Sequence, residues 1–304
     1  MNVWPPPALV LCAGLGTRLR PLTEYRAKPA MPVGDDVLVG YILRDLATAG
    51  ITDAVLNLHH LPATVTREIG DGTQYGVRVR YSWEQPRVLG SAGGPRHALP
   101  LLDGDTVLIV NGDTLCDLPV RQLWERHHAS GALVTLGLMP HPAPGRYGGV
   151  TLDADVTGPL PLEGRVTGFV PRTSTEPSVH FPGIQVVDRS VFAAIPDDTP
   201  AETVLGIYPQ LMADRPGSVH GVVFDARFED VGRVDDYLRA CRALAGDAAG
   251  NVVASRASVH PDAVLRHCVV WPEGVVPSGC ELERVVVTGH MPLTVGATLI
   301  DQVA

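Results

Sequence analysis

The sequence predicts an α/β protein with a mainly parallel mixed sheet, helices on both faces of that sheet, and a short left-handed β-helix at the C-terminal end. Three observations lead to this fold class. Short apolar runs alternate with amphipathic stretches up to about residue 246, a loop with two glycines follows the first apolar run, and small or branched apolar residues recur about every six positions after Val259. Alternating strands and helices favour parallel pairing, with helices covering both faces.

The elements of the first part follow from the spacing of apolar residues. Continuous apolar runs predict buried strands, and amphipathic stretches of eight or more residues predict helices. The expected strands are 8–13, 53–58, 77–83 and 106–113. The expected helices are 37–50, which Gly50 closes, 62–70, and 92–102, whose start should lie near Pro95. The segment 146–187 is richer in strand and turn residues, as in an inserted substrate-binding half.

The tail has a different pattern. Ala263, Val269, Val275 and, after an offset, Val287 mark spacings near six with turn residues between them, which predicts coils of a left-handed β-helix. An ordinary β-hairpin tail is the alternative. A helix of so few coils needs a partner surface over its open end, so we expect a homo-oligomer formed through the coils. The expected domains are a catalytic domain at 1–246 and the tail at 251–304.

Composition excludes several classes of protein. The formal net charge is −9, whereas a surface that follows nucleic-acid phosphates needs a basic stripe. No apolar run approaches the roughly 18 residues of a membrane span, and the first residues lack the basic region of a signal peptide. The five cysteines have no metal-type spacing, which suits a reducing compartment. We therefore expect a cytoplasmic protein that binds neither nucleic acid nor membrane.

The loop "AGLGTRLRPLT" at 13–23 is a candidate phosphate site. Gly14 and Gly16 would let backbone N–H groups approach a phosphate closely, and Arg18 could meet phosphate oxygens with its planar fork. No Gly-Lys-Ser/Thr follows, so this is not a P-loop, and Leu19 stands where a dinucleotide fingerprint needs its third glycine, which weakens a nicotinamide-dependent dehydrogenase. A plain turn with surface arginines is the alternative.

Lys28, in "AKPAMPV", is the only lysine of the chain, which otherwise uses arginine. Pro29 favours an extended backbone at Lys28 and would fix the direction of its side chain. An ammonium is a compact, rotatable point charge that can follow a phosphate oxygen as it moves, whereas a guanidinium prefers one planar geometry. An accident of composition is the alternative.

Two acidic motifs could hold a metal ion. Asp113 in "NGD" ends the strongest predicted strand, at the sheet edge where ligands bind in open α/β folds. Asp230 in "FEDVG" precedes a predicted helix. Mg²⁺ typically takes one or two carboxylates and leaves its other positions to phosphates and water. Asp225 and Glu229 are alternates, Asp113 could be a turn residue, and Asp230 could cap the helix.

Taken together, "LCAGLGTRLRPLT", "KPAMPV", "EQPRVLGSAGG", "NGD", "RYGGV" and "FEDVG" resemble, in this order, the sugar-1-phosphate nucleotidylyltransferases, or NDP-sugar pyrophosphorylases. The resemblance spans 8–246 and is strongest to mannose-1-phosphate guanylyltransferase-like members, some of which carry a β-helical tail. It implies an Mg²⁺-dependent reaction in which a sugar 1-phosphate attacks the α-phosphorus of a nucleoside triphosphate and releases pyrophosphate.

The resemblance also implies roles for individual residues. Arg18 and Lys28 would be catalytic, and Asp113 and Asp230 would bind the metal. The nucleotide would lie on Ala13, Gly14, Gly16, Thr17, Glu84, Gly90, Ser91 and Gly112. The sugar phosphate would lie on Tyr147, Gly148, Arg172 and Gly183.

Substrate identity is open in the sequence. Glu84 could accept from the two adjacent donors of guanine, which favours GTP and mannose 1-phosphate. A UDP- or dTDP-sugar enzyme is the alternative, and a non-catalytic sensing subunit is the alternative of another class, although such a subunit could dispense with Arg18, Lys28 and the two aspartates. The chain also departs from the family, because Pro171 and Arg172 replace a common Glu-Lys pair. His180 or Gln185 could take over sugar contacts, or could be structural.

Overall fold

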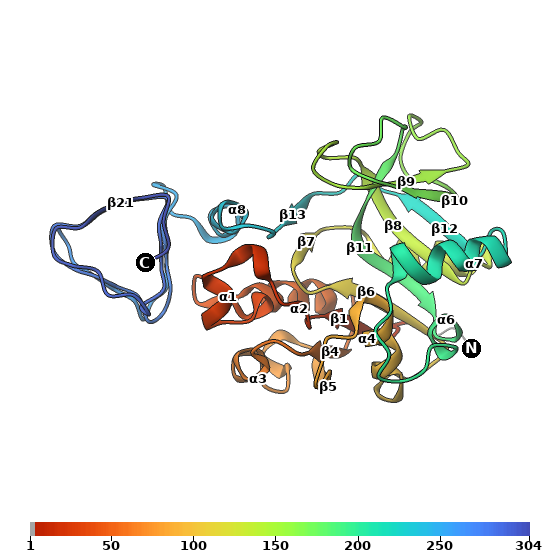
Figure 1. Ribbon diagram of the computed structural model, residues 1–304, viewed down its shortest axis with the longest axis horizontal. Helices are drawn as coiled ribbons and strands as arrows, with labels where there is room; N and C mark the ends of the chain where they lie inside the picture. Colours follow the sequence, from red (N-terminus) through yellow and green to blue (C-terminus); the bar gives the residue numbers. More distant parts are fainter. Residues whose placement is uncertain (1–3) are drawn as a thin grey trace. The chain divides into compact units, whose positions relative to one another are not determined.

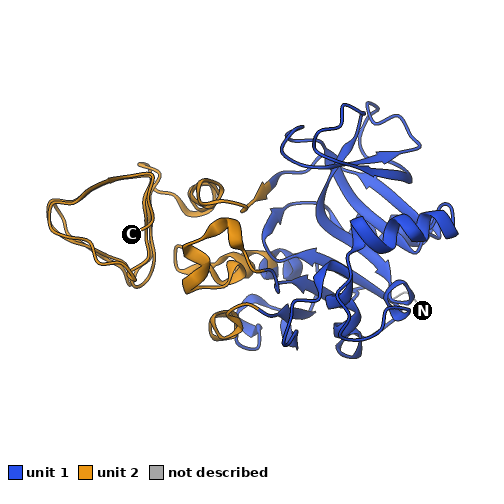
Figure 2. Ribbon diagram, viewed as in Figure 1, with its two compact units in different colours: residues 1–14, 43–59, 70–228 blue, residues 15–42, 60–69, 229–304 orange. Residues whose placement is uncertain are grey.

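The computed structural model describes residues 4–304, which form two compact units (Figure 2). The first unit holds the residues up to Gly14, Leu43–His59 and Gly70–Phe228. The second holds Leu15–Ile42, His60–Ile69 and Glu229–Ala304. Within the described residues, every helix is too short or too polar to cross a membrane.

The first unit is built on one nine-stranded sheet (Figure 1). Its order is β5 (Arg78–Trp83), β4 (Asp53–Leu58), β1 (Ala8–Leu11), β6 (Thr106–Asn111), β11 (Val179–Asp188), β8 (Val134–Pro140), β12 (Val219–Val223), β10 (Leu162–Val170) and β9 (Gly149–Leu152). Strands β5, β4, β1 and β6 are parallel, as are β8 and β12, whereas β11 is antiparallel to both of its neighbours. The predicted mixed sheet, with parallel strands and with helices on both faces, is confirmed, and the sheet is Rossmann-like.

Helices cover both faces of this sheet because alternate residues of each strand point to opposite sides. Val134, Leu136 and Leu138 of β8 belong to the core that also contains residues of three of the helices. Thr135 lies between these residues and points to the other face of the sheet. Its hydroxyl is 2.9 Å from Nδ1 of His127, which lies on the helix Val120–Ser130. The helices are α4 (Gly90–Ala98), α6 (Ser190–Ala193) and α7 (Tyr208–Asp214) on the core side, and α5 (Val120–Ser130) on the other.

Helix α4 begins earlier than expected. Pro95 lies inside the helix, in its second turn, rather than near its start. The amides of Ala92 and Gly93, in the first turn, donate to the carbonyl of Ala201 at 2.9 and 3.2 Å. The segment around residue 201 therefore satisfies the donors of the helix start.

The second unit contains the tail and residues 15–23 of the predicted phosphate loop. Its elements before the tail are η1 (Thr17–Leu19), α1 (Leu22–Tyr25), η2 (Lys28–Ala30), β2 (Pro32–Val33), β3 (Asp36–Val37), the first turns of α2 (Leu38–Thr48), α3 (Pro62–Ile69) and α8 (Val234–Ala245). The remaining short elements of the catalytic part are η3 (Thr73–Tyr75), η4 (Leu99–Leu101), β7 (Thr114–Cys116), η5 (Thr203–Ile207) and β13 (Phe228–Asp230).

The tail is a β-helix with parallel strands on three sides of a triangular outline (Figure 1). Its strands are β14 (Val252–Val253), β15 (Ser258–Val259), β16 (Val264–Arg266), β17 (Val269–Val270), β18 (Val275–Val276), β19 (Glu281–Glu283), β20 (Val286–Val287) and β21 (Thr298–Ile300). Val252 pairs with Val269, which pairs with Val286, so one coil takes 17 residues. Two of the three sides in each coil are six residues apart and one is five, which accounts for the predicted spacing near six.

The direction of Val275 differs from the expected pattern. Val275 is 55% exposed, whereas its neighbour Val276 is 1% exposed and lies in the core of the coils. Adjacent valines occur on several of these strands, so the sequence pattern alone does not say which one of a pair points inward.

Candidate functional site

The glycine loop lies directly against the lysine in the second unit. Gly16 has a left-handed backbone with φ of 60°, and a Cβ added there would lie 2.7 Å from Thr23 Cγ2 and 3.5 Å from Lys28 Cβ. The Thr23 hydroxyl donates to the Gly16 carbonyl at 3.0 Å. Glycine is therefore required at position 16 both for its conformation and for the close approach of Thr23, and Lys28 lies in ordinary van der Waals range of the same position.

Lys28 is held by a short turn, not by the extended backbone that we expected from Pro29. Lys28 is the first residue of η2, and the amides of Ala30 and Met31 donate to the carbonyls of Ala27 and Lys28 at 2.8 and 3.1 Å. These two bonds give Lys28 a helical backbone despite the following proline. The side chain is 7% exposed, so this turn and its packing fix its direction.

Arg18 and Asp230 converge on Gly232 within the same unit. A Cβ added at Gly232 would lie 2.9 Å from Asp230 Oδ2, 3.4 Å from Asp236 Oδ2 and 3.5 Å from Arg18 Nη1. Asp236 caps α8 by accepting from the Arg233 amide at 3.1 Å, the role that Asp230 could have had. The predicted phosphate-gripping arginine and the predicted metal ligand therefore lie close to each other.

In the first unit, the ends of β1 and β6 lie side by side, as parallel pairing requires. Ala13 and Gly14 follow β1, and Gly112 and Asp113 follow β6. A Cβ at Gly112 would lie 2.5 Å from Cys12 Sγ, so only glycine fits there. Burial, and then the Asp113 carboxylate, raise the pKa of the Cys12 thiol well above its usual range, so this thiol is a neutral packing group.

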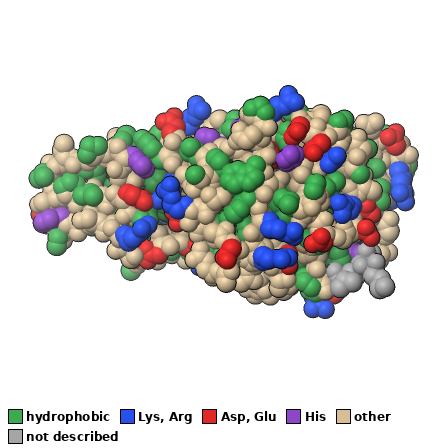
Figure 3. Space-filling view, turned by 90° about the horizontal axis from the view of Figure 1, so that it is seen from below, with side chains coloured by type: hydrophobic (Ala, Val, Ile, Leu, Met, Phe, Trp, Pro, Cys, Tyr) green, Lys and Arg blue, Asp and Glu red, His purple; other side chains and the backbone are tan. Residues whose placement is uncertain are grey.

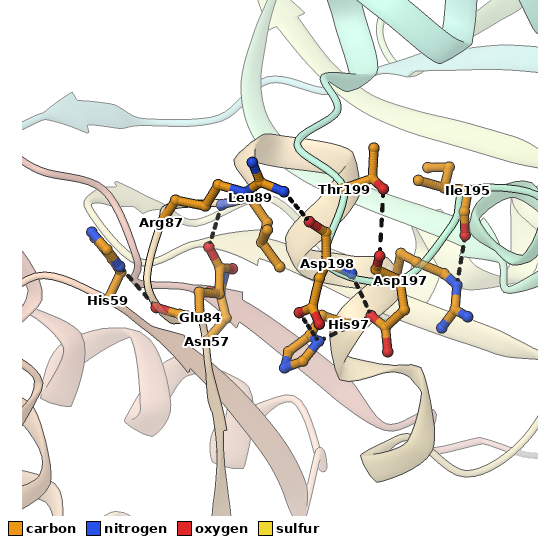
Figure 4. A network of polar contacts seen from close by, with 11 residues as sticks. Asn57, His59, Glu84, Arg87, Leu89, His97, Ile195, Asp197, Asp198 and Thr199 are labelled. Carbon is orange, nitrogen blue, oxygen red and sulfur yellow. Dashed lines mark hydrogen bonds and ion pairs between the residues drawn. The ribbon is translucent and has the colours of Figure 1, made fainter.

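Glu84 is the centre of a buried polar network (Figure 4). Asn57 Nδ2 donates to Glu84 Oε1 at 2.7 Å, and the Leu89 amide donates to Glu84 Oε2 at 2.6 Å. Asn57 Oδ1 accepts from the Cys12 amide at 2.8 Å, just before the glycine loop. The Glu84 side chain is 0% exposed and both of its oxygens accept from protein groups, so in this structure it presents no oxygen to a base edge. Glu84 therefore gives no ground for preferring guanine, and it shapes the loop 84–91 from within.

Ser91 is also engaged with the protein. Its hydroxyl donates to Glu202 Oε2 at 2.5 Å and accepts from the Thr203 amide at 2.9 Å. Gly90 has φ of +78°, and a Cβ there would lie 2.6 Å from Glu202 Oε1. The segment 201–203 thus closes around the loop that was expected to bind the nucleotide.

His180 packs against three partly exposed rings near the turn 146–150, which was predicted to bind the sugar. The ring centroids of Tyr147, Phe228 and His141 are 4.8, 4.7 and 5.6 Å from that of His180. His180 is 6% exposed, and among the described residues neither of its ring nitrogens forms a well-aligned hydrogen bond, although the Gly148 backbone lies near enough to affect its pKa. Burial, and then His141, lower the pKa of His180 to about 4, although the Gly148 backbone acts in the opposite sense. His180 is thus a neutral imidazole with one donor and one acceptor to offer.

The other residues predicted to bind the sugar phosphate have different settings. Gly183 has φ of +92°, and any Cβ there would collide with the Asn111 side chain, which brings β11 close to the "NGD" motif. Gly148 is exposed beside Tyr147, and a Cβ there would lie 3.0 Å from the Val170 carbonyl. Arg172 is exposed on the turn that follows β10.

A surface cluster connects α4 to the segment 195–199 (Figure 4). His97 Nδ1 lies 3.0 Å from Asp197 Oδ1 and 3.3 Å from Asp198 Oδ1. Among the described residues, these three form the only group of three or more His, Cys, Asp or Glu side chains close enough to share a metal ion. The hydrogen bond from His97 lowers the pKa of Asp197, as an ordinary surface ion pair does.

The sequence patterns did not identify Asn57 and Glu202, whose hydrogen bonds support the loops of the site from behind. One local signal could have indicated Asn57, because it is a polar residue one position before the end of a mostly apolar strand. No local signal indicated Glu202. His59 is hydrogen-bonded through Nδ1 to the Glu84 carbonyl oxygen at 2.8 Å, and His60 through Nε2 to the Thr23 carbonyl oxygen at 2.6 Å. On the face drawn in Figure 3, basic and acidic side chains are interspersed.

Comparisons with known proteins agree with the motifs. The family model described as "Nucleotidyl transferase" matches residues 7–246. A mannose-1-phosphate guanylyltransferase of Mycobacterium tuberculosis is 30% identical, over 96% of this chain and 82% of its own. An N-acetylmuramate alpha-1-phosphate uridylyltransferase of Neisseria meningitidis is 32% identical, over 79% of this chain and 98% of its own. HddC from Yersinia pseudotuberculosis, at 20% identity and a TM-score of 0.67, shares the fold over 78% of this chain and 99% of its own.

Proposed function

The chain belongs to the nucleotidyl transferase family, and on that premise we propose that it transfers a guanylyl group from GTP to mannose 1-phosphate, giving GDP-mannose and pyrophosphate. That it is a sugar-1-phosphate nucleotidyltransferase follows from its family and relatives. The main structural support is that Gly16 of the glycine loop lies near Lys28, and that Arg18 and Asp230 both lie near Gly232. The guanylyltransferase relative, similar over nearly the whole chain, supports GTP and mannose 1-phosphate.

A uridylyltransferase acting on another sugar 1-phosphate is the second candidate. The N. meningitidis relative, named for UMP transfer, is as similar to this chain as the guanylyltransferase is. The buried carboxylate of Glu84 removes the sequence argument for guanine. The two candidates share one chemistry and differ in the base and the sugar.

The reaction needs cations more than it needs a base. A phosphate monoester has a second pKa near 6, so the sugar phosphate is already largely dianionic at pH 7. Its oxygen forms the new bond to the α-phosphorus while the bond to the bridging oxygen breaks and pyrophosphate leaves. The obstacle is the repulsion between two polyanions, and it is overcome by positioning and neutralisation. We assign Lys28 to the α-phosphate, Arg18 to the β- and γ-phosphates, and the amides of 13–17 to the phosphate oxygens.

Asp113 and Asp230 are the proposed ligands of a divalent cation, Mg²⁺. Their carboxylate oxygens are the donors that this hard ion prefers, and the half-exposed carboxylate of Asp230 lies near Arg18, where phosphate would bind. When bound, the cation would neutralise triphosphate charge. Replacing either aspartate with alanine should lower turnover by orders of magnitude while the protein stays folded. Full activity of Asp113→Ala would remove this assignment.

His180 is the proposed sugar-reading residue in place of the missing acid. A neutral imidazole can donate to one sugar hydroxyl and accept from another, and a buried ring whose nitrogens form no well-aligned hydrogen bond with the described residues gains most from such a ligand. Tyr147 and Phe228 offer apolar faces beside it. Arg172 is proposed to hold the sugar phosphate.

The deciding experiment is a matrix of GTP, UTP, dTTP and ATP against mannose, glucose and N-acetylmuramate 1-phosphates, followed by pyrophosphate release. The proposal requires the highest kcat/KM for GTP with mannose 1-phosphate. A maximum at UTP would establish the second candidate, and no release with any pair would support the sensing alternative.

We also propose a homo-oligomer through the coils. Several apolar side chains are exposed on their outer surface, among them Val253 at 42% and Ile300 at 51%. Replacing both with serine should lower the mass measured by light scattering. An unchanged mass would contradict this assembly.

A further inference from the structure

The segment that carries Lys28 contacts the β-helix through Arg26, two residues before the lysine. The Arg26 side chain is only 11% exposed, and its Nη2 donates to Glu273 Oε1 at 2.7 Å. Its Nη1 donates to Glu68 Oε1 at 2.8 Å, and its guanidinium carbon lies 5.7 Å from the centre of the Trp271 ring. Trp271 and Glu273 lie on one coil, between β17 and β18. The start of the lysine segment, at Arg26, is therefore held by the ion pair with Glu273 and by the ring of Trp271.

The same tryptophan also reaches the other end of the segment. Trp271 Nε1 donates to the Tyr237 hydroxyl oxygen at 2.8 Å, and the Tyr237 hydroxyl donates to the carbonyl of Pro32. Trp271 and Tyr237 are both 0% exposed. Burial also raises the pKa of Tyr237 well above its usual range, so its hydroxyl keeps the proton that it donates.

Between these two attachments the chain has little freedom. Lys28 is two residues after Arg26 and four before Pro32, and the 3₁₀ turn η2 occupies the interval. The Ala27 amide also donates to the Thr64 hydroxyl oxygen at 3.1 Å. A movement of the coil that bears Trp271 would shift both ends of this short segment, and with them the ammonium group.

We propose that the C-terminal β-helix sets the position of Lys28, with Arg26, Trp271 and Glu273 as positioning residues. The proposal rests on the function proposed above, in which Lys28 meets the reacting phosphates. A tail that only covers apolar surface would change stability when altered. A tail that positions Lys28 changes the surroundings of this lysine and the turnover number, and leaves triphosphate binding to the loop amides and Arg18.

The single lysine makes a direct test possible. Protein labelled with [¹⁵N]lysine gives one lysine amide signal in a ¹H–¹⁵N correlation spectrum, that of Lys28. We compare wild type with Glu273→Gln, which breaks the charge pair, and with Trp271→Phe, which keeps a ring and removes the donor to Tyr237. Glu281→Gln, the same substitution at an exposed position on β19 of the same coil, is the matched control.

Both test variants should shift the Lys28 signal and lower kcat by about 10- to 100-fold, since small misplacements of a catalytic group cost this much. The KM for the triphosphate should change by less than about threefold, and Glu281→Gln should match wild type in every readout. Thermal melts check folding, and if Trp271→Phe does not fold, Glu273→Gln carries the test, because its side chain is 44% exposed.

An unmoved Lys28 signal in Glu273→Gln, with normal kcat, would overturn the proposal. A shift and a loss of kcat of the same size in the Glu281→Gln control would also overturn it, because the effect would then not depend on the contact with Arg26. If wild type transfers no nucleotide with any substrate pair, the proposed function fails, and the lysine signal still reports whether the tail sets the surroundings of Lys28.

Discussion

At the scale of single residues, Lys28 is the residue on which the proposed chemistry depends most. It is the only ammonium side chain of the molecule and is almost fully buried beside Gly16. An arginine there would keep the charge but bring a larger, planar group into a position that is 7% exposed. Burial at this position therefore fits the sequence argument for a compact donor.

Lys28→Arg should lower transition-state stabilisation by about 2–4 kcal/mol, as the loss of one preorganised donor does. Triphosphate affinity should fall much less, because Arg18 and the loop amides remain. The measurement is kcat together with the triphosphate dissociation constant. Equal losses in both quantities would place Lys28 in ground-state binding, and no loss in either would make its position an accident of composition.

Glu84 leads to a prediction about the loop that it supports. Glu84→Gln would place an amide N–H₂ opposite a group that already donates, either Asn57 Nδ2 or the Leu89 amide. An unsatisfied buried donor costs about 1–3 kcal/mol, so the free energy of unfolding should fall by that amount. The KM for the triphosphate should rise, because the loop 84–91 loses its anchor.

Urea unfolding and initial-rate kinetics measure these two effects. Glu176→Gln, at an exposed loop position, is the control and should be silent in both. A Glu84→Gln protein as stable as wild type would show that the carboxylate is not needed for the fold of the loop.

At the scale of elements, the sequence predicted most where the pattern of burial is regular along the chain. The strand at Thr106–Asn111 and the helix at Pro62–Ile69 were predicted within two residues, because apolar runs and amphipathic periods report burial directly. The start of α4 was not predicted, since its first amides donate to Ala201, a hundred residues away in sequence. Candidate ligands were likewise found from motifs, whereas the supporting Asn57 and Glu202 depend on long-range contacts that no local pattern encodes.

The coils provide a matched test of which residues face inward. Val276→Thr places a hydroxyl among the apolar side chains of the coil core and should cost about 1–3 kcal/mol in the free energy of unfolding. Val275→Thr, one residue earlier and 55% exposed, should cost almost nothing. Thermal unfolding of the two isosteric variants, compared with wild type, measures the difference. Equal costs would show that the two valines do not face opposite sides.

At the scale of the whole molecule, the two compact units are not contiguous in sequence. The sequence predicted a domain boundary between 246 and 251, a stretch between the end of α8 at Ala245 and the start of β14 at Val252. Contacts nevertheless group the coils with Leu15–Ile42 and His60–Ile69. A linear pattern cannot reveal such a division, because it depends on pairs such as Arg26 and Glu273 that are far apart in the chain.

Stability of the whole chain should fall in mild acid, partly because of His127. Burial, and then the neighbouring His128, lower the pKa of His127 to about 4; His220 acts in the same sense, and Asp188 opposes it. The unfolded chain binds this proton near pH 6.5 and the folded chain only near pH 4, so stability is lost as the pH falls between these values. The loss from this one group is at most about 3 kcal/mol.

His127→Gln should therefore flatten the dependence of the unfolding free energy on pH between 6.5 and 4. Urea titrations at pH 7.5, 6 and 5 for both proteins measure the slopes. Parallel slopes would mean that His127 becomes protonated in the folded protein at its ordinary pKa.

The 17-residue period of the tail restricts how its length can change. Val252, Val269 and Val286 lie one above another, so a duplicated block of 17 residues would add one rung to each ladder and keep every inward side chain inward. An insertion of 16 or 18 residues would rotate all later positions and turn side chains such as Leu282 toward water. The tail can therefore be lengthened in whole coils by gene duplication, a modular growth that the nine-stranded sheet does not permit.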